Sequence, residues 1–330
     1  KPGMHRYMPN SGYLHTRKEV SSHLATEFNL KFEACDVVMT CGAAGALNIA
    51  LKTILEPGDE VIVISPYFPE YLSYIDNHGG QIVVTNSDIN FMPSLDKIDN
   101  AVNCKTKAVI INTPNNPTGV VYSDNLLNSL GQLLEHKSSV MGHPVYLISD
   151  EPYRRIMYEG AKFPAPATYY RETIITNSYS KDLSLPGERI GYLAVNPGIS
   201  DKEELMAGFI YSNRILGFVN APALAQNLVT KLQSARVSIE DYQQKRDCLY
   251  YGLKEIGYDI TKPAGSFYVF PKTPDSDDLA FVNRLMDFGV LAVPGTGFGV
   301  KGYMRLSYCV NENTIRGALA GLKKAFEDVK

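Results

Sequence analysis

An acidic side chain and a phenol stand directly after one apolar, β-branched run of the sequence. Residues 145–148 form the run, and Asp150 and Tyr153 follow it. If the run is a buried strand, Asp150 needs a positive or hydrogen-bonding partner, because an unpaired buried carboxylate is strongly destabilising. Asp150 is therefore a candidate for pairing with a ligand, and capping of a following helix is the alternative.

A lysine follows the next apolar run along the chain. Lys181 comes shortly after residues 173–176, with hydroxyl groups at Ser178 and Ser180 before it and the guanidinium of Arg189 after it. Most lysines are solvated surface residues. This one lies where a buried strand is expected to end, and it is therefore a candidate reactive lysine.

Small residues after the run at 37–39 suit the binding of a phosphate. The segment 40–47 includes Gly42, Ala43 and Ala44 and is expected to open a helix, whose free N–H groups and positive dipole end attract anions. The segment matches neither the GxGxxG nor the GxxxxGK[ST] pattern. An ordinary strand-to-helix turn is the alternative interpretation.

An aromatic ring and an amide follow two other runs. Phe68 lies between two prolines after residues 61–64, where it either stacks on a planar ring or packs in the core. The turn-forming segment 112–119 follows residues 108–111. It places amide side chains, including that of Asn116, at the edge of the sheet.

One arginine stands in an apolar strand near the carboxyl terminus. Arg305 lies within residues 302–308, and burial of its guanidinium requires an anion. That anion is either a ligand or a carboxylate of the protein in a structural salt bridge.

The alternation of apolar runs with helical stretches predicts a scaffold for these side chains. Helices are expected over residues 43–55 and 124–136, and ligands bind beyond the carboxyl ends of parallel strands, where the candidate residues should meet. Seven runs are typical of strands in a mostly parallel sheet with crossover helices: residues 37–39, 61–64, 82–85, 108–111, 145–148, 173–176 and 190–195.

The chain is expected to divide into a large domain, residues 1–222, and a smaller α+β domain, residues 223–330. An amphipathic stretch over 223–256 predicts one long helix that leads into the smaller domain. A terminal helix from Thr314 and three short strands complete it: residues 267–270, 290–293 and 304–308.

Length, charge and cysteine content exclude several classes of protein. The 330 residues exceed a small binding module, and 32 Lys+Arg against 35 Asp+Glu, without a block of like charges, argue against nucleic-acid binding. No stretch is apolar enough for a membrane span. Five scattered cysteines without a CxxC pair indicate the cytoplasm, and the six histidines form no metal-binding pattern.

Three motifs together resemble the class I aminotransferases of pyridoxal 5′-phosphate (PLP) fold type I, the aspartate aminotransferase-like superfamily. The resemblance runs from Tyr7 to the final helix and implies PLP as the cofactor. It also implies an α/β fold, with a mostly parallel seven-stranded sheet flanked by helices in the large domain and a smaller α+β carboxyl-terminal domain. The motifs are Asn115-Asn116-Pro117-Thr118-Gly119, Asp150-x-x-Tyr153, and Ser178-x-x-Lys181 followed by Gly187-x-Arg189-x-Gly191.

The resemblance assigns roles around the PLP ring. Lys181 would form a Schiff base with the cofactor and carry protons between it and the substrate α-carbon. Asp150 would pair with the protonated ring nitrogen and keep the ring electron-withdrawing. Asn116 and Tyr153 would hydrogen-bond the ring hydroxyl, and Phe68 would stack on the ring.

The resemblance also assigns residues to the phosphate and the substrate. Arg305 and Asn116 would bind the substrate, with Arg305 on its α-carboxylate. Tyr7 would reach the phosphate of a neighbouring subunit, which implies a homodimer with shared active sites. The phosphate would be held by the first strand-to-helix turn, a hydroxyl and a guanidinium: Gly42, Ala43, Ala44, Ser178 and Arg189.

Several departures from the family pattern leave the amino acid open. Gly208 stands where the aspartate-specific branch has an arginine for the side-chain carboxylate, and Arg214 lies six residues further on. Glu151-Pro152 also differs from the usual pair. The family's N-terminal arm, which helps to read the substrate side chain, is expected to precede Lys1.

The resemblance implies an aminotransferase, which moves an amino group between an L-amino acid and a 2-oxo acid in ping-pong half reactions. A PLP-dependent carbon-sulfur lyase, a decarboxylase or another enzyme of this fold is an alternative, because the same residues serve these reactions. The PLP-sensing domain of a transcription regulator is another. A nicotinamide-binding enzyme is disfavoured, since no GxGxxG follows the first strand.

Overall fold

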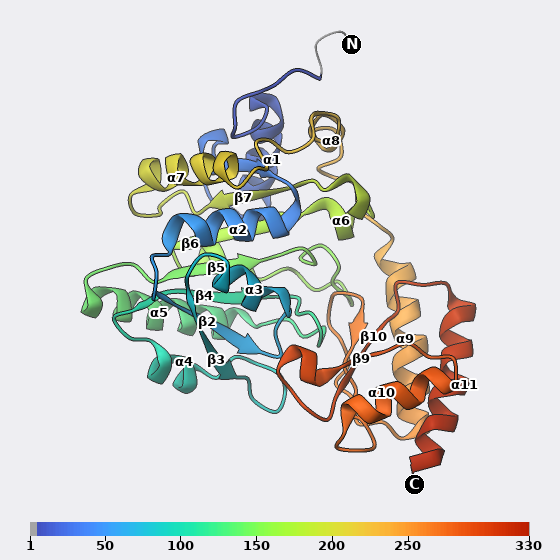
Figure 1. Cartoon of the computed structure of the whole chain (residues 1–330). Helices are drawn as coiled ribbons and strands as arrows, with labels where there is room; N and C mark the ends of the chain where they lie inside the picture. The colour runs from blue at the N-terminus through green and yellow to red at the C-terminus, as the bar shows by residue number, and fades with distance from the viewer. Residues whose placement is uncertain (1–4, 330) are drawn as a thin grey trace.

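A seven-stranded sheet forms the centre of the computed structural model, which describes residues 5–329 (Figure 1). The strand order is β1-β7-β6-β5-β4-β2-β3, and β7 alone runs opposite to the other six strands. The predicted mostly parallel sheet is therefore confirmed, and each strand overlaps its predicted run. The strands are β1 Val37–Thr40, β2 Glu60–Ser65, β3 Gln81–Asn86, β4 Thr106–Asn112, β5 Tyr146–Asp150, β6 Thr173–Ser178 and β7 Gly191–Val195.

Helices connect and cover these strands. The two helices predicted at 43–55 and 124–136 are α2 and α5, and α5 continues five residues further than predicted. No helix within residues 5–329 is long and apolar enough to cross a membrane. The helices around the sheet are α1 Leu14–Phe28, α2 Gly42–Ile54, α3 Glu70–Asp76, α4 Leu95–Ala101, α5 Asp124–Met141, α6 Tyr179–Asp182, α7 Lys202–Ile215 and α8 Ala223–Val229, with short 3-10 turns at Ala34–Asp36, Pro166–Thr168 and Pro186–Glu188.

Helices cover both faces of the sheet over most of its strands, and successive strand residues point to opposite sides. The edge strand β3 is the exception, because its Ile82 and Val84 are exposed. Ala108 and Ile110 of β4 pack on the face that α2, α3 and α7 cover. Val109 and Ile111 of the same strand pack on the face that carries α4 and α5. Such two-sided burial explains why the strands appear as continuous apolar runs in the sequence.

The last third of the chain forms a smaller unit beside the sheet (Figure 1). It has its own apolar core, which includes Leu253, Phe281 and Leu322, and α9 packs along α11. The strand predicted over 290–293 overlaps the observed strand only at its last residue. The elements are α9 Ile239–Ile256, β8 Tyr268–Val269, α10 Asp278–Asp287, β9 Val293–Pro294, a 3-10 turn at Gly295–Phe298, β10 Met304–Ser307 and α11 Glu312–Val329, with strand order β8-β10-β9.

The prediction of a single helix over 223–256 is wrong, because residues 230–238 are not helical and separate α8 from α9. Ser238 caps α9 by accepting a hydrogen bond from the Asp241 N–H. Val229 of α8 packs with Val20 of α1, whereas α9 packs on α11, so the two helices serve different cores. We therefore propose that the smaller domain begins with α9 and not at residue 223.

A glycine that brings α5 close to a neighbouring loop gives a test of this packing. A Cβ atom at Gly131 would lie 2.5 Å from the backbone oxygen of Tyr169. Gly131→Ala should therefore lower the free energy of unfolding by about 1–3 kcal/mol, measured by urea denaturation. Gly317→Ala is the matched control, since nothing lies within 4 Å of its Cβ position in α11. It should raise stability by up to about 1 kcal/mol, and equal effects would contradict the packing.

Candidate active site

A cavity of about 350 Å³ lies between the carboxyl ends of β4, β5 and β6 and the smaller unit. All the predicted site residues line it except Gly42 and Tyr7. The structure thus brings together side chains that are far apart in the sequence. The other lining residues are Leu47, Glu70, Asn112, Pro152, Ser180, Pro186 and Tyr268.

Asp150 lies at the end of β5 as a buried carboxylate. Its Oδ2 accepts a hydrogen bond from the Tyr71 hydroxyl at 2.6 Å, and its Oδ1 accepts one from Thr176 at 3.1 Å. No cation within residues 5–329 forms an ion pair with it. Burial raises the pKa of Asp150 to about 6, although both hydrogen bonds oppose that shift.

Sequence reasoning missed Tyr71, the nearest hydrogen-bond donor to Asp150. Tyr71 lies in the first turn of α3, three residues after Phe68, and the two rings contact edge-on with centroids 5.5 Å apart. Its spacing from Phe68 was the only signal in the sequence. The alternative role of Asp150 as a helix cap is wrong, since its carboxylate oxygens bond side chains.

Lys181 is partly buried in α6, the short helix after β6. Its Nζ lies 5.5 Å from the centre of the Phe267 ring, and no carboxylate of residues 5–329 lies within ion-pairing distance. Desolvation lowers the pKa of Lys181, and the charges of Arg189 and Arg305 lower it further, against an opposing effect of Cys309. A lowered pKa increases the fraction of Lys181 that is present as the neutral, nucleophilic amine.

Another part of the cavity wall offers hydrogen-bond donors that suit an anion. α2 begins at Gly42 without a side-chain cap, so its first N–H groups are not bonded by a capping side chain. A Cβ at Gly42, where φ is +75°, would lie 2.8 Å from Nη2 of Arg189. A Cβ at Gly191 would lie 2.8 Å from the Gly42 Cα, so glycine allows both segments to approach.

Ser178 and Arg189 complete that wall. The Ser178 Oγ donates to Ser180 Oγ at 2.6 Å, and the Arg189 Nη1 donates to the Pro186 carbonyl at 3.0 Å. Arg189 has a left-handed φ of 46° and no carboxylate partner within residues 5–329. Hydroxyl, guanidinium and helix N–H groups together suit a phosphate.

Arg305 reaches the cavity from β10 of the smaller unit. Its Nη1 donates to the Asn116 Oδ1 at 2.9 Å, and its guanidinium lies 4.5 Å from the Tyr268 ring centre and 4.9 Å from that of Phe298. Within residues 5–329 it forms no salt bridge, so the alternative of a structural ion pair is wrong. The guanidinium is oriented by an amide and two rings and keeps donors for a carboxylate.

Two asparagines and a pair of phenols hold the middle of the cavity. Asn112 donates to the Asp150 carbonyl at 2.9 Å and accepts from the Asn116 N–H at 2.7 Å. The Tyr153 hydroxyl donates to that of Tyr268 at 3.3 Å. Asn112 belongs to the segment 112–119 that the sequence places at the sheet edge, but it was given no role there, and Tyr268 was not singled out. The contacts of both residues depend on the meeting of separate strands.

The cavity lining does not include Gly208, Arg214 or Tyr7. Gly208 packs in α7 against α2, where a Cβ would lie 2.6 Å from Thr53 Cγ2, so a larger side chain at this position requires Thr53 to shift. Arg214 is exposed near the end of the same helix. Tyr7 is 92% exposed.

The cavity fits PLP, the cofactor that the sequence motifs imply. The protonated ring nitrogen of PLP would supply the cation that a buried Asp150 carboxylate lacks. The start of α2, Ser178 and Arg189 form a donor set for its phosphate, and Lys181 lines the same cavity as a partly desolvated amine.

Comparison with known proteins gives an independent view of the chain. The family model for aminotransferase class I and II matches residues 1–322. A probable aspartate aminotransferase of Methanocaldococcus jannaschii is 33% identical over 98% of this chain and 86% of its own length. The aspartate/prephenate aminotransferase of Thermus thermophilus is 32% identical over 96% and 82%. A crystal structure of an aminotransferase from Eubacterium rectale, 40% identical, superposes with a TM-score of 0.96 and covers 98% of this chain and 82% of its own.

The raised pKa of Asp150 predicts how stability depends on pH in the cofactor-free protein. The folded protein keeps a proton on Asp150 that the unfolded chain, with a pKa of 3.8, has released, so the free energy of unfolding falls as pH rises from about 4 to 6. Asp150→Asn should remove that loss and be more stable at pH 7 by up to about 3 kcal/mol. Urea denaturation at several pH values measures both.

A second variant controls for the cause of that dependence. Tyr71→Phe removes a hydrogen bond that favours the ionised carboxylate, so the loss of stability should extend to higher pH. The same pH dependence in wild-type protein and Asp150→Asn would contradict the assignment.

Proposed function

The chain belongs to the class I and II aminotransferase family and is a PLP-dependent aminotransferase, and from this premise we propose that amino-group transfer takes place in the cavity of Asp150, Lys181 and Arg305. One observation carries the proposal. Asp150 is a buried carboxylate without a cationic partner in the described chain, and it lies in the same cavity as a desolvated lysine. A structural carboxylate would instead be neutralised by a neighbour.

Each end of the cofactor has its own set of residues in this proposal. PLP, when bound, supplies an electron-withdrawing ring that stabilises negative charge on the α-carbon of an amino acid. Asp150 would pair with the ring nitrogen, Asn116 and Tyr153 would hydrogen-bond the ring hydroxyl, and Phe68 would pack on the ring face. The residues that would hold the phosphate are Gly42, Ala43, Ala44, Ser178 and Arg189.

Lys181 is the proton carrier in this proposal. Its lowered pKa favours the neutral amine, which would hold the cofactor and would take the proton from the substrate α-carbon. The amino group leaves one L-amino acid, which becomes a 2-oxo acid, and a second 2-oxo acid accepts it. Arg305 binds the α-carboxylate in both halves of the reaction.

We also propose that the protein works as a homodimer in the cytoplasm. Tyr7 is 92% exposed on its own subunit, which supports contact with the phosphate of a partner subunit. Exposed apolar side chains on α1, α7 and α8, including Leu14, Tyr211 and Leu224, offer a surface for that partner. All five cysteines are free thiols, which favours a reducing compartment.

Replacing Lys181 tests the proposed reaction centre. Lys181→Ala should lower glutamate formation from a panel of L-amino acids with 2-oxoglutarate by at least about 10²–10⁴-fold, because the proton carrier is lost. After borohydride reduction of the wild type, peptide mass mapping should find PLP on Lys181. Lys301→Ala, a variant of an exposed lysine, should behave as wild type. PLP on another lysine, or pyruvate formed without glutamate, would refute the proposal.

Replacing Arg305 tests carboxylate binding separately. Arg305→Gln keeps a hydrogen-bonding side chain but removes the charge, so KM for the amino acid should rise by about 10- to 100-fold. PLP absorbance should be retained, because Arg305 is not assigned to the cofactor. Steady-state kinetics at fixed 2-oxoglutarate measures the effect, and an unchanged KM would remove Arg305 from carboxylate binding.

A further inference from the structure

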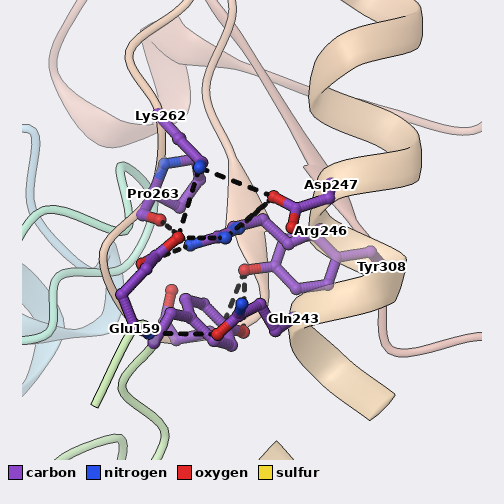
Figure 2. A network of polar contacts seen from close by, with 9 residues as sticks. Glu159, Gln243, Arg246, Asp247, Lys262, Pro263 and Tyr308 are labelled. Carbon is purple, nitrogen blue, oxygen red and sulfur yellow. Dashed lines mark hydrogen bonds and ion pairs between the residues drawn. The ribbon is translucent and has the colours of Figure 1, made fainter. Parts of the chain in front are cut away.

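A fully buried guanidinium joins the smaller unit to the segment that follows Tyr153. Arg246 of α9 is 0% exposed, and its Nη1 and Nη2 donate to the Glu159 carboxylate at 3.0 and 2.5 Å (Figure 2). Its Nε donates to Asp247 at 3.0 Å, and Nη1 also donates to the Pro263 carbonyl at 3.0 Å. Glu159 and Asp247 therefore bind one cation from two sides.

The same guanidinium lies over the ring of Tyr158, which is hydrogen-bonded to a second tyrosine. It stands 4.5 Å from the ring centre of Tyr158, whose hydroxyl lies 3.0 Å from that of Tyr308. Both hydroxyl groups reach the carbonyl of Ser266, that of Tyr308 at 3.2 Å. Ser266 is itself buried with a left-handed φ of 59°, so its backbone is held in an unusual conformation.

The segment 263–268 crosses between the two units at this point. The N–H groups of Ala264 and Gly265 donate to the Gly119 carbonyl at 2.9 and 3.0 Å. The Ser266 N–H donates to the Ile156 carbonyl at 2.9 Å. The large unit thus holds one side of the segment, and the Arg246 cluster holds the other.

This crossing segment leads directly into the substrate end of the cavity. Tyr268 accepts the Tyr153 hydrogen bond, and its ring lies beneath the Arg305 guanidinium. Tyr308 follows Arg305 by three residues, and its N–H donates to the Phe267 carbonyl at 3.1 Å. A shift at Pro263 or Ser266 would therefore move both Tyr268 and the strand that carries Arg305.

Charge makes this contact sensitive to substitution. A buried guanidinium is costly unless its donors are bonded to anions, and Glu159 supplies two of those bonds. Hydrogen bonding from Arg246 lowers the pKa of Glu159, so the carboxylate is ionised at neutral pH. Lys262 reinforces the pair at 3.2 Å from Glu159 and 3.7 Å from Asp247.

We propose that the Glu159–Arg246 pair positions Arg305 for the substrate α-carboxylate by fixing the crossing segment 263–268. Neither member of the pair lines the cavity, so both are positioning residues. The inference rests on the proposed role of Arg305. It goes further in making substrate affinity depend on a contact outside the cavity.

Glu159→Gln tests the inference with little change in shape. KM for the amino acid should rise about tenfold, with kcat changed less than threefold and PLP absorbance retained. Arg246→Lys keeps the positive charge and should give a smaller rise in KM than Arg246→Met. Because Arg246→Met also risks misfolding, Glu159→Gln decides the question, and thermal denaturation of each variant verifies folding.

An exposed ion pair in the smaller unit provides the matched control. Arg284 contacts Asp328 at 2.8 Å at the surface. Arg284→Gln should leave KM unchanged. A lower melting temperature for Glu159→Gln with an unchanged KM would mean that the pair only stabilises the fold, and this result would overturn the inference.

A double variant separates this inference from the proposed function. If the pair acts through Arg305, Glu159→Gln should add no further rise in KM to Arg305→Gln. Additive effects would overturn the positioning role while leaving carboxylate binding by Arg305 intact. An unchanged KM for Arg305→Gln alone would instead defeat the carboxylate assignment, and with it the inference.

Discussion

The carboxylate of Asp150 ends a strand that has neighbours on both sides, where water barely reaches it. Such a group is stable only if donors surround it, and the surrounding elements supply them. α3 presents Tyr71, β6 presents Thr176, and the asparagine at the end of β4 fixes the carbonyl of Asp150 itself. The Asp150 carboxylate still lacks a positively charged partner, and a protonated ring nitrogen would supply one. Because β5 lies next to β6 in the sheet, Asp150 lines the same cavity as Lys181.

The second constraint comes from the smaller unit, which carries the cation for the substrate. Arg305 is held by an amide from the β4 loop and by aromatic rings from its own unit, without a carboxylate partner in the described chain. Its position therefore depends on how the two units meet. At that junction the Gly119 carbonyl accepts backbone hydrogen bonds from the segment 263–268, and the buried Arg246 guanidinium donates to the Pro263 carbonyl. In our proposal these contacts set the position of Arg305.

Close backbone approach is the third requirement, and glycine meets it. Gly42 and Gly191 let the start of α2, β7 and the Arg189 guanidinium converge. Arg189 has a left-handed φ, and its guanidinium lies against the start of α2 at Gly42. This wall of the cavity is thus built from backbone N–H groups, the Ser178 hydroxyl and the Arg189 guanidinium, and it tolerates little added volume.

The sequence by itself determined the seven strands, the helices α2 and α5, and the residues that end the strands, because these features are local. A doubly buried strand must be apolar, and a chemically active residue after it stands out. The periodicity over 223–256 led to the wrong prediction of one helix. It indicates that the segment has an apolar face, but it does not indicate which core that face packs on. Tyr71 bonds Asp150 across 79 residues of sequence, Arg246 bonds Glu159 across 87, and Arg305 bonds Asn116 across 189. Such pairs follow from strand order and from the meeting of two units, and only the tertiary structure decides them.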